Sequence, residues 1–198
     1  MHRRLLTLVA LLLVSAVPMF ASQFVELPFD QVAREAKFVV RANVIDTWSA
    51  WDDSGQVIYT YATLRVTRYF GEATGPDTLV VREVGGTVDG YTQQAVGFPE
   101  IRRGERVVLF LADDEDGVNL RIHAYNQGKF LVRNRAGEEV LVADPVHQGD
   151  DREQPARRLQ MQTESIGADI PAMSIDEFAA MVDDARAGGH HGPRAQRQ

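Results

Sequence analysis

The chain has 198 residues, of which 44% are hydrophobic and 25% charged, with a formal net charge of −7 and no cysteine. This is the composition of an ordinary globular protein with room for one domain and extensions, and its acidic balance argues against nucleic acid as a partner. The lack of cysteine excludes disulfides, thiolate zinc sites, iron–sulfur clusters, cysteine nucleophiles and a lipid-anchored signal, which needs a cysteine.

Residues 1–21 are predicted to be an export signal. Basic residues at Arg3 and Arg4 precede an uncharged apolar run, Leu5 to Val17, which is shorter than the roughly 20 residues of a membrane-spanning helix. The small residues Ala21 and Ser22 place the expected cleavage between them. We therefore expect a periplasmic or secreted protein that contacts a membrane only through the signal segment before cleavage. An uncleaved anchor is the alternative.

The predicted folded domain spans residues 24–143 and begins with a short helix within residues 24–36. There, Phe29, Val32, Ala33 and Ala36 have the spacing of one helical face. From residue 38 to residue 45 the apolar pattern alternates with period two, which predicts a strand. The segment 48–55, with two tryptophans followed by Asp-Asp-Ser-Gly, predicts a turn at the end of this strand.

A long second strand is predicted over residues 57–70, followed by a third over 78–84 that ends at Gly85-Gly86. The second strand alternates between an apolar face and a more polar face. We assign Ile58, Ala62, Leu64, Val66 and Phe70 to the first face, and Tyr59, Tyr61, Thr63, Arg65 and Thr67 to the second.

The next stretch contains a predicted hairpin within residues 87–96 that turns at Asp89-Gly90, since this dipeptide tolerates positive φ. Residues 98–105 form a surface corner that leads into the most apolar strand, 106–111. The arginines of this corner, with two glutamates beside them, predict a solvated surface with local ion pairs; they are Arg102, Arg103 and Arg106, with Glu100 and Glu105. Strands at 120–125, 129–133 and 139–142 complete the predicted sheet.

Residues 144–173 are polar and without period, which predicts a linker. A second helix is expected over residues 174–187, opened by a capping box between Ser174 and Glu177. Its apolar face is Ile175, Phe178, Ala179 and Val182. Residues 188–198 are expected to be a disordered tail.

Many short strands, few helices and no βαβ rhythm predict a mainly β fold: a small OB-like closed β-barrel with a short N-terminal helix and a C-terminal helix. Segments 38–44, 61–66, 69–71 and 104–111, in this order, resemble the netrin-like modules of tissue inhibitors of metalloproteinases and related bacterial secreted proteins. The resemblance implies a five-stranded OB-like barrel that binds other macromolecules. Those inhibitors chelate zinc through an amino-terminal cysteine, which this chain lacks, so their mechanism is not carried over to any residue here.

The common catalytic and metal-binding motifs do not fit the sequence. There is no Gly-x-Ser-x-Gly, and Thr87 stands where a dinucleotide-binding loop needs its second glycine. An EF-hand register over the acidic turn 113–117 would begin at Ala112 and place His123 where a bidentate Glu is needed. The adjacent His190 and His191 lack the preorganisation of a metal site. We therefore assign no catalytic residue, no metal and no cofactor.

Tryptophan and tyrosine are concentrated between residues 48 and 69, which indicates either cross-strand packing or an amphipathic contact surface. We assign ligand binding to Trp48, Trp51, Asp89 and Tyr91, and predict an exported non-enzymatic binding module with a protein or carbohydrate partner in the envelope or outside the cell.

Two alternatives stay open at this point. One is a protease inhibitor, or an accessory of a secreted metalloprotease, that acts through a cysteine-free contact. The other is a hydrolase that uses Asp, Glu and His side chains, in which His123 with Asp89 and Glu105 would perform acid–base chemistry.

Overall fold

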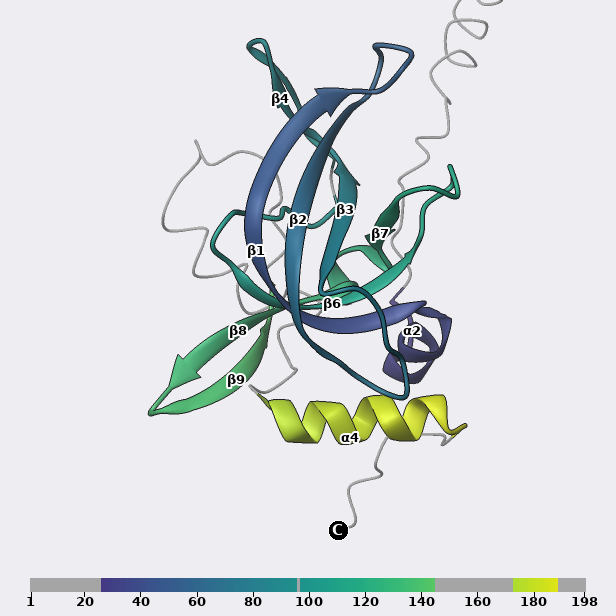
Figure 1. The fold of residues 1–198 in the computed structure, drawn as a ribbon, viewed down its shortest axis with the longest axis vertical. Coiled ribbons are helices and arrows are strands. Elements are labelled where there is room, and N and C mark those ends of the chain that lie inside the picture. Colours follow the sequence, from purple (N-terminus) through teal and green to yellow (C-terminus); the bar gives the residue numbers. More distant parts are fainter. Residues whose placement is uncertain (1–25, 96, 145–172, 189–198) are drawn as a thin grey trace, which may run out of the picture.

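A computed structural model describes residues 26–95, 97–144 and 173–188 (Figure 1). The predicted signal, most of the predicted linker and nearly all of the predicted tail lie outside these residues. No helix in the described ranges is long and apolar enough to cross a membrane. The elements are helix α2 (Phe29–Glu35), strands β1 (Phe38–Trp51), β2 (Ile58–Tyr69), β3 (Thr78–Val84), β4 (Gly86–Val88), β5 (Tyr91–Gln93), β6 (Arg106–Asp113) and β7 (Leu120–Ile122), the 3-10 turn η1 (Tyr125–Gly128), strands β8 (Lys129–Arg135), β9 (Glu138–Ala143) and β10 (Met173–Ser174), and helix α4 (Ile175–Arg186).

Five strands form a closed barrel in the order β1-β2-β3-β7-β6, and β6 returns to pair with β1. All neighbours are antiparallel except β3 and β7, which are parallel. The prediction of a small, mainly β, OB-like closed barrel is therefore confirmed.

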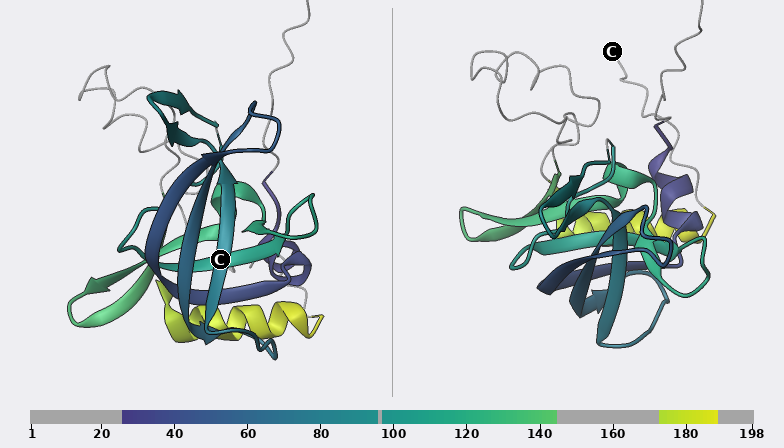
Figure 2. Two further views of the ribbon diagram at one scale, coloured as in Figure 1. Left: turned by 45° about the horizontal axis from the view of Figure 1, so that its top comes forward. Right: turned by 90° about the horizontal axis from the view of Figure 1, so that it is seen from above.

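Strand β6 is buried on both of its faces, as its apolar sequence predicts. Every side chain from Val107 to Leu111 is fully buried. Even residues of β6 face one hydrophobic cluster and odd residues face the other, so a single strand supplies two packed layers. Strand β6 also pairs with β8, and from there the sheet continues through β9 to β10. The β8–β9 hairpin projects away from the barrel (Figure 2).

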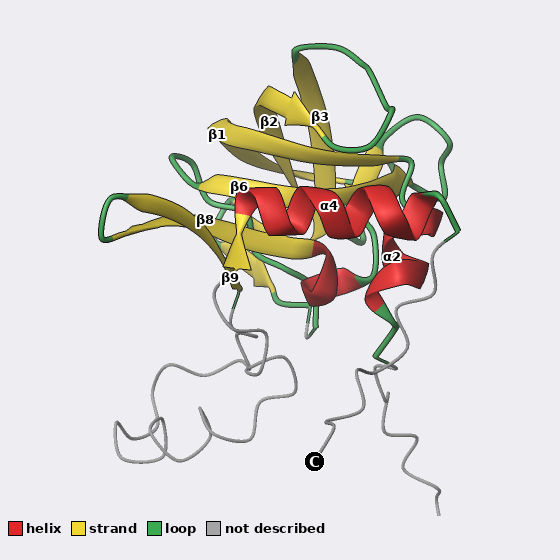
Figure 3. Ribbon diagram, turned by 90° about the horizontal axis from the view of Figure 1, so that it is seen from below, coloured by secondary structure: helices red, strands yellow, loops and turns green. Residues whose placement is uncertain are grey.

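Helices α2 and α4 cover one end of the barrel (Figure 3). The predicted capping box of α4 is confirmed, because the Ser174 hydroxyl accepts from the Glu177 backbone N–H and the Glu177 carboxylate accepts from the Ser174 backbone N–H. The predicted apolar face is also confirmed, with Phe178 and Val182 completely buried against the barrel.

The structure corrects two element boundaries. Residues 48–51 were predicted to form a turn but continue β1, where they pair with residues 58–61 of β2. A register shift between Val44 and Asp46 interrupts the alternation of buried and exposed positions, which hides this extension in the sequence. The strand predicted over 120–125 ends at Ile122, because Ala124 and Tyr125 have φ of 59° and 54° and turn the chain into η1.

Candidate functional site

A row of three side chains crosses the outer surface of the barrel on β1, β2 and β3. Trp48 pairs with Tyr61, and Tyr61 pairs with Arg82, so the three lie side by side on adjacent strands. The Trp48 and Tyr61 rings are stacked, with centroids 5.2 Å apart and planes 8° from parallel. The Arg82 guanidinium lies 4.3 Å from the ring centroid of Tyr59 on β2. We call these three residues, together with Tyr59, the aromatic row.

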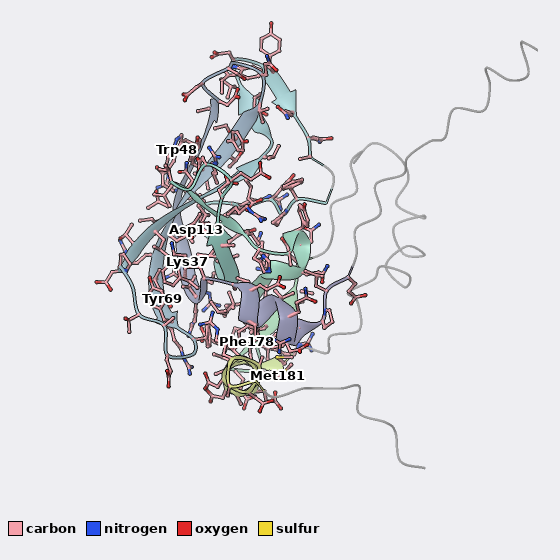
Figure 4. All side chains as sticks on the ribbon, turned by 90° about the vertical axis from the view of Figure 1, so that its right-hand side faces the viewer. Lys37, Trp48, Tyr69, Asp113, Phe178 and Met181 are labelled. Atoms are coloured by element: carbon pink, nitrogen blue, oxygen red, sulfur yellow. The ribbon has the colours of Figure 1, made fainter. Side chains whose placement is uncertain are left out.

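The register shift in β1 places Trp48 on this surface. Before the shift, Val40, Ala42 and Val44 point into the barrel. After the shift, Asp46 and Trp48 are exposed although they continue the same even numbering. Trp48 keeps 43% of its surface exposed, and Figure 4 shows it on the sheet, far from Phe178 and Met181 of α4.

The arginine of the row is held by the loop between β6 and β7. Its guanidinium lies 2.5 Å from an Asp114 carboxylate oxygen and 2.9 Å from one of Asp116. Burial lowers the pKa of Arg82, but hydrogen bonds to Asp114 and Tyr61 outweigh this effect and raise it. Hydrogen bonds from Asn119, first from its backbone N–H, lower the pKa of Asp116 to about 2. The loop therefore fixes the guanidinium at the end of the row.

The acidic turn 113–117 is exposed except at Asp114. The Asp114 side chain is only 12% exposed, because it packs against Arg82. Asp113 pairs with Lys37 at 2.6 Å, and both side chains are about half exposed (Figure 4).

The four predicted binding residues fall into two places. Trp51 lies three positions after Trp48 on β1 and therefore on the opposite face of the strand. It contacts Tyr91 of β5, with ring centroids 6.1 Å apart, and Asp89 lies in the adjacent turn of the β4–β5 hairpin with φ of 49°. The structure brings together Trp51 and Tyr91, with Asp89 close by in the chain, whereas Trp48 belongs to the aromatic row.

Sequence reasoning missed Arg82 as a member of this surface. The residue stands in a predicted strand without any motif, and its carboxylate partners lie in a loop more than thirty positions away. The tyrosine at position 69, counted in the sequence with the others, lies elsewhere. Its ring packs on Phe38 and its hydroxyl donates to the Pro76 carbonyl at 2.8 Å.

The residues named for acid–base chemistry are not brought together. His123 Nε2 lies 3.2 Å from Glu35 Oε2, at an angle that makes no hydrogen bond. Glu105 contacts Lys129 at 2.9 Å, and Asp89 lies in the hairpin turn. Within the described part of the chain, no group of three or more His, Asp or Glu side chains is placed to hold a metal ion.

No protein-family model matches this chain, and the comparison with curated proteins and solved structures gives no significant match. The aromatic row is therefore judged on its own chemistry. It offers a preorganised pair of aromatic rings beside a cation that two carboxylates hold in place.

Proposed function

We propose that the chain is an exported, non-enzymatic binding module and that the aromatic row is its contact surface. The observation that carries this proposal is the stacked Trp48–Tyr61 pair, which leaves 43% of the tryptophan exposed. Tryptophan and tyrosine provide large contact areas at a low cost in side-chain entropy. Stacking on Tyr61 fixes the orientation of Trp48 before any partner arrives, which lowers the cost of binding.

The position of the row on the barrel also supports a binding role. It lies on the outer face of β1, β2 and β3, between the loop that joins β1 to β2 and the loop that joins β6 to β7. OB barrels use this face and these two loops to bind oligosaccharides and oligonucleotides. Because a fold does not define a function, the ligand is assigned from the side chains of the row.

Among partner classes, a neutral oligosaccharide suits the row best. Arg82 is already paired with two aspartates, so it offers no free charge to a phosphate or a carboxylate. The net charge of −7 opposes a polyanion such as nucleic acid. The exposed face of Trp48 remains for stacking on a sugar ring, and the aspartates can accept hydrogen bonds from hydroxyls. A protein partner is the alternative that the experiment distinguishes.

The test is to screen purified protein against an array of neutral oligosaccharides and, in parallel, to use it as bait on envelope and secreted proteins. Trp48→Ala should reduce binding at least about tenfold, which corresponds to the loss of one stacking contact. Its stability should fall by up to about 1.5 kcal/mol for the lost aromatic pair, in addition to the apolar area that the ring buries.

Tyr91→Ala is the matched control, because Tyr91 is 67% exposed and lies on the hairpin. If Tyr91→Ala abolishes binding and Trp48→Ala does not, the contact surface is the Trp51–Tyr91 pair and the assignment to the row is wrong. If only protein partners are captured, and Trp48→Ala abolishes their capture, the oligosaccharide is wrong but the surface stands. If Trp48→Ala costs several degrees in Tm and leaves all binding intact, the row is structural packing.

A further inference from the structure

A groove of about 510 Å³ lies where β6 and β8 separate. The two strands pair from Leu109 and Lys129 to Val107 and Leu131, and then diverge. The groove has a wall formed by residues 102–106 and another formed by residues 131–134. Its volume is in the range of ligand-binding clefts.

The groove is basic although the chain is acidic. Four arginines line it, Arg102, Arg103, Arg106 and Arg133, against a single acidic residue, Glu105. Glu105 was predicted to pair with these arginines, but its carboxylate instead lies 2.9 Å from Lys129 Nζ. We call this site the arginine groove.

Two of the arginines have part of their charge balanced nearby. Arg102 pairs with Glu100 at 2.5 Å, and Arg106 pairs with Glu139 at 2.7 Å. Arg103 and Arg133 are exposed, and neither forms an ion pair with any residue that the structure describes. These two guanidiniums give the arginine groove an uncompensated positive charge from both of its walls.

One edge of β8 is open in the groove. Strand β8 pairs with β9 from Phe130 to Arg135, but it pairs with β6 only up to Leu131. From Val132 to Arg135, the edge that faces the groove has no strand neighbour among the described residues. An open edge of this kind offers backbone donors and acceptors to an extended peptide, which is the geometry of strand addition. At about 3.3 Å per residue, the edge spans roughly 13 Å, enough for four or five peptide residues.

We propose that the arginine groove binds an acidic, extended segment of a partner protein, which adds as a strand to the free edge of β8. Backbone hydrogen bonds to residues 132–135 would hold the segment, and Asp or Glu side chains of the segment would pair with Arg103 and Arg133. The charge complementarity selects an acidic segment, because the remainder of this chain is acidic and would repel it elsewhere. This surface is separate from the aromatic row.

The experiment measures fluorescence anisotropy of a dye-labelled six-residue peptide of alternating glutamate and valine. We expect saturable binding that weakens as salt is raised. A lysine–valine peptide of the same length should not bind. A glutamate–valine peptide with N-methylated backbone amides should bind at least about tenfold more weakly, because it cannot complete the strand pairing.

Arg103→Glu and Arg133→Glu should each weaken binding about tenfold, the size expected for losing a charged hydrogen bond. The matched control is Arg65→Glu, an exposed arginine of β2 outside the groove, which should leave binding unchanged. Trp48→Ala should also leave it unchanged, so failure of this proposal and failure of the aromatic-row proposal are distinguishable. All four residues are exposed, and each variant is checked for an unchanged Tm.

Three results would overturn the proposal. Absence of binding to the acidic peptide is the first. Equal binding of the N-methylated peptide would mean that the edge of β8 takes no part. Direct binding of inorganic phosphate or a sulfated polysaccharide to the groove, without binding of the peptide, would show a site for small anions or polyanions instead.

Discussion

At the scale of single residues, Lys129 holds three segments together. Its side chain is 1% exposed, and its Nζ lies 2.9 Å from a carboxylate oxygen of Glu105 and 2.8 Å from one of Asp144. It also donates to the backbone carbonyl of Glu100. One ammonium therefore links the corner before β6, the start of β8 and the residue that follows β9.

We expect Lys129→Met to lower the free energy of unfolding by about 3–5 kcal/mol, because it leaves two largely buried carboxylates without their counter-ion. Urea denaturation at neutral pH gives this value. The control is Lys37→Met, whose pair with Asp113 is about half exposed and should cost no more than about 1 kcal/mol.

A double change of Glu105→Gln and Asp144→Asn in the Lys129→Met background should recover part of the loss, because it removes the unpaired charges. Equal costs for Lys129→Met and Lys37→Met would contradict the role assigned to the buried ammonium.

Sequence reasoning did not predict this contact, for a physical reason. A lysine after Gln-Gly has the local pattern of an exposed turn, and charged residues are almost never fully buried unless they are paired. The two carboxylates lie far from Lys129 along the chain. Only the closure of the barrel and the return of β9 bring them within 3 Å.

At the scale of elements, α4 is attached to the barrel through a cluster of phenylalanines. Phe178 is completely buried and contacts four rings, with centroid separations of 5.7 Å to Phe29, 5.2 Å to Phe70, 5.7 Å to Phe110 and 5.7 Å to Phe130. These rings come from α2, the end of β2, β6 and β8. The helix is therefore part of the hydrophobic core.

We expect Phe178→Ala to cost about 3–5 kcal/mol, since it opens a cavity at the centre of this cluster. Met181→Ala on the same helix should cost clearly less, because Met181 is only half-buried (Figure 4). Thermal denaturation followed by circular dichroism compares the two variants. Similar losses of Tm would mean that α4 packs loosely and that the ring contacts contribute little.

The local signals of α4 were sufficient to predict its start and its apolar face, because a capping box and helical spacing depend only on neighbouring residues. The surface on which it docks was not predicted, since this depends on rings from four distant segments. The same distinction explains β1. Its first half follows the alternation, while its second half, including Trp48, is defined by pairing with β2 after the register shift.

At the scale of the whole molecule, the barrel has one short seam between β3 and β7. The two strands share a single paired position, Val81 with Leu120. Side chains complete the seam. Glu83 accepts a hydrogen bond from the Ile122 backbone N–H at 2.5 Å, and Arg82 contacts Asp114 in the loop before β7. Closure of the barrel therefore depends on a carboxyl group that is only 6% exposed.

The protonation of Glu83 makes the stability of the barrel depend on pH. Burial raises the pKa of this carboxyl to about 8, although the hydrogen bond from Ile122 and the charge of Arg121 oppose the rise. The negative charge of Asp114 adds to it. Because the folded pKa lies above the ordinary value of 4.5, the folded state holds a proton that the unfolded state releases between these two pKa values. The contribution of the protonated Glu83 carboxyl to the free energy of unfolding is complete below about pH 4.5. It is lost as the pH rises through about 8.

We therefore expect the wild type to lose roughly 2–4 kcal/mol of stability between pH 5 and pH 9 relative to Glu83→Gln. Glutamine keeps the acceptor for the Ile122 N–H but has no charge to desolvate. Comparing the two proteins at each pH cancels the titration of groups that they share. The range from pH 5 to pH 9 also lies above the pH at which Asp52 and Asp116, with pKa values of about 2, take up protons. Denaturant unfolding at pH 5, 7 and 9 measures both proteins. Parallel pH profiles would show that Glu83 has the same protonation in the folded and unfolded states, and the β3–β7 seam would then not make the fold sensitive to pH.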